Sequence, residues 1–408
     1  MKRIYLDHSA TTPLDERVFQ KMEPFFSDFF GNPSSIHSFG MEAMEAVEKS
    51  RRQVADFLNA TPEEIIFTSG ATESDNLAVF GIAEQLEKDG YSLDGLHFLT
   101  TKLEHPAVEE PFLKLKRRGA EVDFLPVGKN GVVDPLDVKK AIKENTVFIS
   151  VVYVNSEVGS RQPIGEIGKI VSGIKEDRVK GDNSFPLYFH TDAVQAANFF
   201  SCDVKELGVD LLSLSGHKVY GPKGVGALYV RNGIRIKGQQ VGGHQENNLR
   251  SGTLNVPGIV GLGEALFIVA KERENNNLHL QKMQKKLIDG IKEKIPNAYL
   301  NTDLTNATPS HVHFAFPGAE GEAVLMELDM RGICVSVGSA CASSSLKASP
   351  TLMAMGVPKE IIHGAVRMTL GKNNTDQEIE KILTVLPEVI EKYRAMAPKN
   401  INYGNFNE

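Results

Sequence analysis

The sequence predicts an α/β protein of two domains, a large one built on a mostly parallel sheet and a smaller α+β one. Its 408 residues exceed the roughly 250 to 300 at which a single hydrophobic core usually divides. Over 15–261, helical patterns alternate with short apolar runs, which is typical of a parallel sheet with helices on both faces. From residue 262 the pattern changes to long helices. We therefore expect a large domain over 15–261 and a smaller one that includes 262–408.

The elements follow from the spacing of apolar residues along the chain. A helical pattern covers 41–58, and segment 64–76 combines a short apolar strand, a turn of small residues and the start of a second helix. Further buried strands of the large domain are predicted at 96–100, 147–154, 187–190 and 209–214. In the smaller domain, the polar segment 271–294 predicts an exposed connecting helix, and the elements after it are a strand at 311–316, a helix at 321–330, a strand at 333–337 and a helix at 376–394.

Composition indicates an enzyme of the cytoplasm. The chain is 41% hydrophobic and 24% charged with a net charge of −7, which discourages direct binding to nucleic acid. The longest apolar run, 147–154, falls well short of the roughly 20 residues of a membrane helix. The amino terminus lacks a hydrophobic signal region, and three cysteines exclude a disulfide framework, so a reducing compartment is expected. We predict no metal site.

Lys218 is the first candidate for catalysis. It follows Ser215, Gly216 and His217, just beyond the strand predicted at 209–214, where α/β folds place their ligands. A lysine amine there can hold an aldehyde cofactor as an imine. The segment by itself is equally compatible with a lysine in a glycine-rich surface turn.

Asp192 ends another predicted strand and supports the interpretation of Lys218 as a cofactor-binding residue. A carboxylate that bonds a pyridinium nitrogen keeps pyridoxal phosphate in its protonated, electron-accepting form. Gln195 can bond the phenolic oxygen of the same ring. Asp192 alone is more typical of an N-cap for a helix that begins near Ala193, but its combination with Lys218 favours the cofactor interpretation.

Two further segments fit the same cofactor. At the helix start within 64–76, backbone N–H groups near Ala71 and the Thr72 hydroxyl present donors and a positive dipole end to a phosphate. His105 follows the strand at 96–100 and precedes a proline, a placement from which it can stack on a flat ring. Each segment also has an ordinary interpretation, a capped turn for the first and a polar surface histidine for the second.

Together these motifs resemble the cysteine desulfurases, which are fold-type-I pyridoxal phosphate enzymes, and specifically the branch that supplies sulfur for iron–sulfur clusters, nitrogenase-type assembly and thiolated tRNA. The resemblance covers nearly the whole chain and rests on six ordered motifs: YLDHSATTP at 5–13, GNPSSIH at 31–37, SGATES at 69–74, SGHK at 215–218, RSGT at 250–253 and GSAC at 338–341.

The resemblance assigns roles to individual residues. It implies that Lys218 carries the internal aldimine, that Asp192 and Gln195 hold the ring and that His105 stacks on it. It also implies a phosphate site made by Thr72, Ser215 and His217, completed in a homodimer by Thr253 of the neighbouring subunit. Residues 1–14 are expected to pack with the smaller domain.

Among the cysteines, Cys341 is the predicted nucleophile, because the family's nucleophile occupies this position and its neighbours are small. Cys202 and Cys334 lie in or beside apolar segments and are expected to be structural. Arg367 matches the arginine that grips the substrate carboxylate, although an isolated arginine there is more typical of a surface ion pair. Asn155 matches a residue that faces cofactor and substrate.

The implied reaction converts L-cysteine to L-alanine and leaves sulfane sulfur on Cys341 as a persulfide. The expected recipient is a sulfur-acceptor protein, such as an iron–sulfur scaffold or a thiolation relay. His105 is a candidate proton carrier, because its unperturbed pKa lies near ~6.5. The alternatives are a selenocysteine lyase, an aminotransferase of the same fold, and a non-catalytic sulfur-delivery protein.

Overall fold

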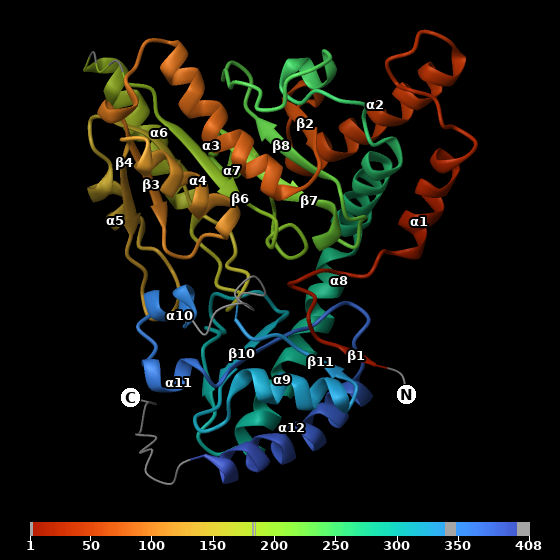
Figure 1. The fold of residues 1–408 in the computed structure, drawn as a ribbon, viewed down its shortest axis with the longest axis vertical. Coiled ribbons are helices and arrows are strands. Elements are labelled where there is room, and N and C mark those ends of the chain that lie inside the picture. The colour runs from red at the N-terminus through yellow and green to blue at the C-terminus, as the bar shows by residue number, and fades with distance from the viewer. Residues whose placement is uncertain (1–2, 182, 184, 339–347, 398–408) are drawn as a thin grey trace.

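The computed structural model describes residues 3–181, 183, 185–338 and 348–397 of the chain. A seven-stranded sheet with helices around it forms the larger part, and a smaller part with two short sheets lies below it in Figure 1. Helix α8 (Val256–Lys294) runs from one part into the other. The predicted α/β class, with a large mostly parallel sheet and a smaller α+β part, is confirmed.

The large sheet has the strand order β2, β8, β7, β6, β5, β3, β4. Neighbouring strands are parallel except at β8, which runs antiparallel to both β2 and β7. The strands are β2 (Ile65–Thr68), β3 (His97–Thr101), β4 (Glu121–Leu125), β5 (Thr146–Ser150), β6 (Tyr188–Asp192), β7 (Leu211–Ser215) and β8 (Gly226–Val230). Most are buried along their whole length, which explains why they are continuous apolar runs in the sequence.

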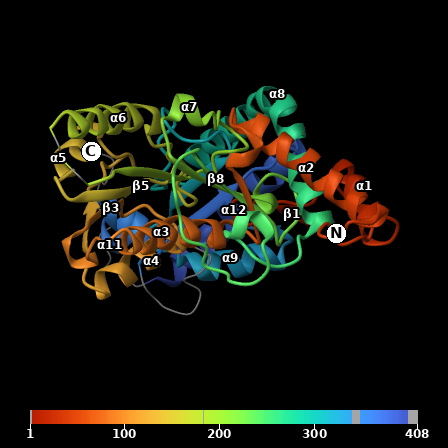
Figure 2. The ribbon, with the colours of Figure 1, turned by 90° about the horizontal axis from the view of Figure 1, so that it is seen from above.

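Helices cover both faces of this sheet (Figure 2). On one face, residues of α3 (Ala71–Lys88) and α4 (Pro106–Arg117) share a core with Phe98 and Phe148. On the other, residues of α2 (Ser38–Leu58), α6 (Ile164–Lys180) and the first half of α8 share a core with Phe67. The remaining helices of this part are α1 (Glu16–Met22), α5 (Pro135–Ala141), α7 (Val204–Leu207) and the 3₁₀ turns η1 (Glu23–Phe26), η2 (Pro62–Glu64), η3 (Leu93–Gly95), η4 (Gly216–Lys218) and η5 (Gln245–Asn248).

The smaller part contains a three-stranded sheet of order β12, β10, β9 and a parallel pair of β1 with β11. Strand β1 comes from the amino terminus, so the first residues of the chain join a sheet strand more than 300 positions later. The elements are β1 (Ile4–Tyr5), β9 (Tyr299–Leu300), β10 (His311–Ala315), α9 (Gly321–Met330), β11 (Ile333–Cys334), α10 (Pro350–Ala354), α11 (Lys359–Ile362), β12 (Ala365–Thr369) and α12 (Asp376–Met396).

The connecting helix differs from its prediction. The sequence predicts an exposed helix at 271–294, but the structure buries one side of this stretch, including Leu280, Leu287 and Ile291. The spacing of these residues is helical, and they join the core of the smaller part. The first half of α8 joins a core of the large part instead. The domain boundary at 261/262 therefore lies inside one continuous helix and stays a prediction.

Two local details differ from the sequence patterns. The alternative of Asp192 as an N-cap does not apply, because residues 194–199 form turns and not a helix. The strand expected at 147–154 is shorter, since β5 ends at Ser150, although the N–H groups of Val151 and Tyr153 still donate to carbonyls of β6. Within the described ranges, no helix combines the length and apolar character needed to cross a membrane.

Candidate active site

A cavity of about 650 Å³ lies where the strands of the large sheet end. Its walls come from the segments that follow β2, β3, β5, β6 and β7, together with the amino-terminal residues 9–11 and Arg367 of β12. The carboxyl ends of parallel strands meet at one edge of a sheet, which is where ligands of such folds bind. Of the predicted site residues, the cavity brings together Ala71, Thr72, His105, Asn155, Asp192, Gln195, Ser215, His217, Lys218 and Arg367.

Lys218 reaches into this cavity from η4, the turn directly after β7. Its Nζ atom donates to the carbonyl of Ser9 at 2.5 Å and to that of Ala10 at 2.7 Å. The amino-terminal segment is tied to the same turn, since Thr12 bonds the carbonyl of His217 through both its N–H and its hydroxyl. Lys218 is therefore held both by its own turn and by the amino-terminal segment, which lie more than 200 residues apart in the sequence.

Asp192 is the last residue of β6 and is buried. One carboxylate oxygen accepts the N–H of Val194 at 2.9 Å. Burial raises the pKa of Asp192, whereas that N–H and the charges of His105 and Lys218 oppose the rise. Gln195, beside it, donates to the carbonyl of Ser9 at 2.8 Å.

The start of α3 lies at the cavity. This 18-residue helix begins at Ala71, and no side chain caps its first turn, so its N–H groups and positive dipole end are directed at the cavity. Ser215 and His217 line the same space, and His217 Nδ1 lies 3.1 Å from the Thr11 hydroxyl. Burial, then Lys218 and Lys223, lower the pKa of His217 to about 4, so its ring is neutral at pH 7.

His105 is the N-cap of α4, and Pro106 occupies the first helical position, where its missing N–H costs nothing. Its Nδ1 accepts the N–H of Ala107 at 3.1 Å. Burial lowers the pKa of His105 despite the opposing charge of Asp192. The neutral ring thus carries its proton on Nε2, because Nδ1 is used as an acceptor.

Arg367 is almost completely buried in β12, with 3% of its surface exposed. Its Nη2 donates to Asp7 at 2.8 Å and its Nη1 to the carbonyl of Ser156 at 3.1 Å. Its buried Nε atom has no hydrogen-bond partner among the described residues. A guanidinium held by both Nη atoms still has N–H donors that these two bonds do not use, and its planar fork is suited to hold a carboxylate.

Asn155 lines the cavity, but its amide is already committed to the protein. Its oxygen accepts the N–H groups of Glu157 and Val158, both at 2.9 Å, and its nitrogen donates to Leu103 and Thr351. The role toward cofactor and substrate stays a prediction, and the structure adds a role in holding the loop after β5.

The remaining predicted residues lie elsewhere. Thr253 is exposed and does not line the cavity of its own chain. Cys341 lies outside the described residues. Cys202 is buried, which raises the pKa of its thiol to about 12, and Cys334 is partly exposed with its sulfur 3.4 Å from Asp329. Neither of these two cysteines borders the cavity.

Sequence reasoning missed several residues that line the cavity. Lys223 adds a second lysine near the start of α3, and the acids Asp75, Glu104 and Glu157 are buried in the walls. Lys223 stands in the same glycine-rich segment as Lys218 and could have been found by its position. The buried acids give no such signal, because an acidic residue in a helix or loop is ordinarily exposed.

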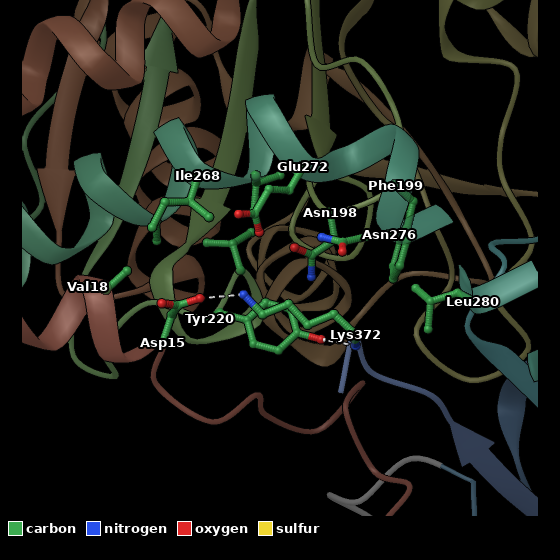
Figure 3. Close-up of a pocket in the computed structure, with 13 residues that line it drawn as sticks. Asp15, Val18, Asn198, Phe199, Tyr220, Ile268, Glu272, Asn276, Leu280 and Lys372 are labelled. Carbon is green, nitrogen blue, oxygen red and sulfur yellow. Dashed lines mark hydrogen bonds and ion pairs between the residues drawn. The ribbon is translucent and has the colours of Figure 1, made fainter. Parts of the chain in front are cut away.

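The turn after Lys218 also borders a second pocket, where Tyr220, Lys372 and Asp15 lie close together (Figure 3). Tyr220 has a positive φ of 60°, and its hydroxyl accepts the N–H of Lys372 at 2.9 Å. The Lys372 ammonium lies 4.4 Å from the centre of the Tyr220 ring and 2.5 Å from Asp15. Lys372 follows β12, so this contact connects the turn of Lys218 with the strand of Arg367.

Known proteins resemble this chain in sequence and in fold. The aminotransferase class-V family matches residues 4–382. A cysteine desulfurase IscS from Dictyoglomus turgidum is 45% identical over 399 residues, which cover 98% of this chain and 97% of that protein. A solved structure described as a NifS-like protein has a TM-score of 0.86 at 36% identity and covers 96% of this chain and all of that one. Another, SspA in complex with cysteine, has a TM-score of 0.76 at 33% identity, with coverages of 91% and 100%.

The fold and the cavity first define a class, the class-V aminotransferase enzymes, a group that depends on pyridoxal phosphate. Identity over nearly the full length then narrows the assignment. The chain belongs to the cysteine desulfurase family.

Proposed function

We propose that this protein is a pyridoxal phosphate-dependent cysteine desulfurase that converts L-cysteine to L-alanine and retains the sulfur on Cys341. The observation that carries the proposal is the meeting of Lys218, Asp192 and Arg367 in one cavity, with an uncapped helix start at one end of it. The lysine suits an aldehyde, the aspartate a ring nitrogen, the helix start a phosphate and the arginine a carboxylate. The cavity therefore fits both the cofactor and an amino acid.

The residues that would hold the cofactor follow from this fit. Lys218 would bind its aldehyde and Asp192 its ring nitrogen, with Gln195 near the phenolic oxygen and His105 against the ring. The first turn of α3 at Ala71 and Thr72, with Ser215 and His217, would receive the phosphate. When bound, the cofactor supplies an electron sink for the substrate α-carbon.

The chain's own residues would carry the remaining steps. Arg367 would hold the substrate carboxylate, with its guanidinium kept in place by Asp7 and Ser156. Lys218, once released from the aldehyde, would move the α-proton. His105 carries a proton on Nε2 beside the cavity and would deliver it near the substrate thiol.

Sulfur transfer is assigned to Cys341. Its thiolate would attack the sulfur of bound L-cysteine, so that an S–S bond forms as the substrate's C–S bond breaks. The electron pair of that bond would stay with the substrate carbon, which takes up a proton and leaves as alanine. The sulfane sulfur would pass to an acceptor protein, such as an iron–sulfur scaffold or a thiolation relay.

The lysine is tested by Lys218→Ala with Lys223→Ala as the matched control, because both lysines line the cavity. We expect Lys218→Ala to abolish desulfuration and the borohydride-reducible attachment of the cofactor, and Lys223→Ala to keep that attachment. Mass spectrometry of the reduced proteins measures this directly. Attachment that survives in Lys218→Ala would refute the cofactor assignment.

The cysteine is tested by Cys341→Ser against Cys202→Ser. The first variant should bind cofactor and L-cysteine yet release no sulfide, because a hydroxyl cannot carry sulfane sulfur. Cys202 is buried away from the cavity, so its variant should still form a persulfide. Full sulfide release by Cys341→Ser would show that another group accepts the sulfur.

A further inference from the structure

Three carboxyl groups line the same region of the cavity and are all buried. Asp75, Glu104 and Asp192 are 0%, 9% and 6% exposed. They come from α3, from the loop after β3 and from the end of β6. Like charges in a buried site disfavour one another, so three ionised carboxylates cannot share this space without cations of their own.

Among the described residues, Asp75 has no cation to neutralise it. Neither of its oxygens has a hydrogen-bond partner of normal geometry there, and the Ser213 hydroxyl is the group that favours its ionised form. The basic group beside it is His190, whose Nε2 lies 3.6 Å away. Burial lowers the pKa of His190 to about 3, and both of its ring nitrogens lie within hydrogen-bond distance of serine hydroxyls, Ser150 and Ser213. His190 is therefore neutral. Asp75 is also the fifth residue of α3, beyond the first turn in which a helix dipole acts.

Glu104 is in a similar position. Its Oε1 accepts from the Thr101 hydroxyl at 2.9 Å and from the N–H of Val152 at 2.8 Å. Its Oε2 is buried without a partner among the described residues, and no ion pair there involves it. The charged groups that act on it are Asp192 and Glu109, both acidic.

The positive charge of Lys218 acts on Asp192 instead. It favours the ionised form of Asp192, whereas Lys218 is not among the groups that act on Asp75 or Glu104. A lone buried charge costs several kcal/mol, so the two acids without cations retain their protons. In agreement, burial raises the pKa of Glu104 to about 8 and that of Asp75 well above its ordinary value.

We infer that Asp75 and Glu104 are held as neutral acids and act as positioning residues for Asp192, leaving it as the one carboxylate of the three that faces the cofactor ring as an anion. The inference rests on the proposed cofactor site. It implies that an amide can replace either acid, because Asn and Gln have the shape of the protonated forms. Removal of the Asp192 charge, in contrast, removes the partner of the ring nitrogen.

Infrared spectroscopy of the cofactor-free protein at pH 7 tests the protonation states without reference to activity. We expect Asp75→Asn and Glu104→Gln each to lose one carbonyl band of a protonated carboxylic acid. Glu157→Gln is the matched control, since Glu157 is equally buried in the same cavity but His313 lies 3.6 Å away and the pKa of Glu157 is lowered. That variant should lose no such band. Protonated-acid bands unchanged in the first two variants would overturn the inference.

The pH dependence of unfolding gives a second readout. Glu104 keeps its proton in the folded chain up to about pH 8 but loses it near 4.5 when unfolded, so wild-type stability should fall relative to Glu104→Gln as pH rises across this window. A difference that is flat between these values would overturn the inference for Glu104.

Cofactor binding separates this inference from the proposed function. Asp75→Asn/Glu104→Gln should retain pyridoxal phosphate with an affinity close to that of the wild type, whereas Asp192→Asn should lose most of it, as measured by equilibrium dialysis. Equal losses in both proteins would overturn the inference. Failure of the wild type to bind the cofactor would instead refute the proposed function and leave the infrared result standing.

Discussion

Arg367 shows how one buried side chain is prepared for a ligand. Its Nη atoms are bound to Asp7 and to the carbonyl of Ser156, and the residue lines the cavity. The neighbouring Asp7 carboxylate offsets part of the positive charge of the empty site, and the two bonds fix the plane of the guanidinium. The ammonium group of a lysine at this position would have no plane to be fixed in this way.

Replacement of Arg367 by lysine should weaken the binding of L-cysteine and that of L-alanine to a similar extent. The lost charge-assisted bond is worth about 1 to 3 kcal/mol, and both ligands share the carboxylate that it binds. Persulfide formation at saturating L-cysteine should change less than binding. Titration of each amino acid and single-turnover sulfur transfer measure the two effects separately. Unchanged affinity for both ligands would show that another group holds the carboxylate.

At the scale of elements, two glycines in α6 have opposite surroundings. A Cβ added at Gly168 would lie 2.1 Å from the carbonyl oxygen of Leu207, at the point where α6 contacts α7. A Cβ added at Gly173 would meet no atom within 4 Å. The first glycine allows the two helices to approach each other. The second has no such role and only increases the backbone entropy that is lost when the helix forms.

This contrast predicts opposite changes in stability for the same substitution. Gly173→Ala should stabilise the protein by about 0.5 to 1 kcal/mol through helix propensity. Gly168→Ala should destabilise it by about 1 to 3 kcal/mol or more, because a backbone carbonyl must move. Denaturant unfolding of both variants provides the measurement. Equal effects would mean that α6 shifts freely on α7.

The contact of Lys372 with Tyr220 and Asp15 is a second feature at this scale (Figure 3). It joins the end of β12 to the turn that carries Lys218, so it aligns the two residues that would hold substrate and cofactor. Asp15 keeps Arg17 as a partner at 2.8 Å when the lysine is absent. Loss of Lys372 should therefore affect alignment more than stability.

Lys372→Met preserves much of the packing over Tyr220 and removes the charge. We expect a raised KM and a lowered kcat for L-cysteine, with a stability loss of only about 1 kcal/mol. Lys282→Met is the control, because Lys282 pairs with Asp376 on the exposed surface. Steady-state kinetics of the two variants measure kcat and KM. Equal values in both variants would refute the proposed role of Lys372 in alignment.

At the scale of the whole molecule, one residue of the predicted phosphate site lies outside the cavity of its own chain. Thr253 is exposed and away from its own cavity. Large apolar side chains are exposed in the amino-terminal part, among them Phe26, Phe30 and Ile36. Both observations support the proposed homodimer, in which Thr253 serves the neighbouring cavity.

A mixed dimer tests this arrangement. Homodimers of the Lys218→Ala subunit and homodimers of the Thr253→Ala subunit should each have weak activity or none. For Thr253→Ala the reason is the lost bond to a phosphate, which costs about 1.5 to 3 kcal/mol. When they are combined, one of the two cavities receives both intact residues only if Thr253 acts across the interface. Activity recovered on mixing at limiting cofactor, compared with the separate variants, is the expected result. No recovery would place Thr253 in its own subunit's site or outside any site.

The sequence by itself determined the fold class and most of the proposed cofactor residues. Lys218, Asp192 and His105 each follow an apolar run, and such runs become parallel strands whose ends meet at one edge. That signal is local, because an apolar strand and the residue that follows it can be recognised within a segment of a few residues. The motif around Cys341 was likewise found in the sequence alone.

Only the tertiary structure decided which distant groups meet. The reversal of β8, the burial of one side of α8 and the pairing of Arg367 with Asp7, 360 positions away, depend on packing between segments that no local pattern connects. The buried acids Asp75 and Glu104 belong to the same category. Whether a carboxyl is ionised is set by the cations and the solvent around it in space, and these are fixed only when the chain has folded.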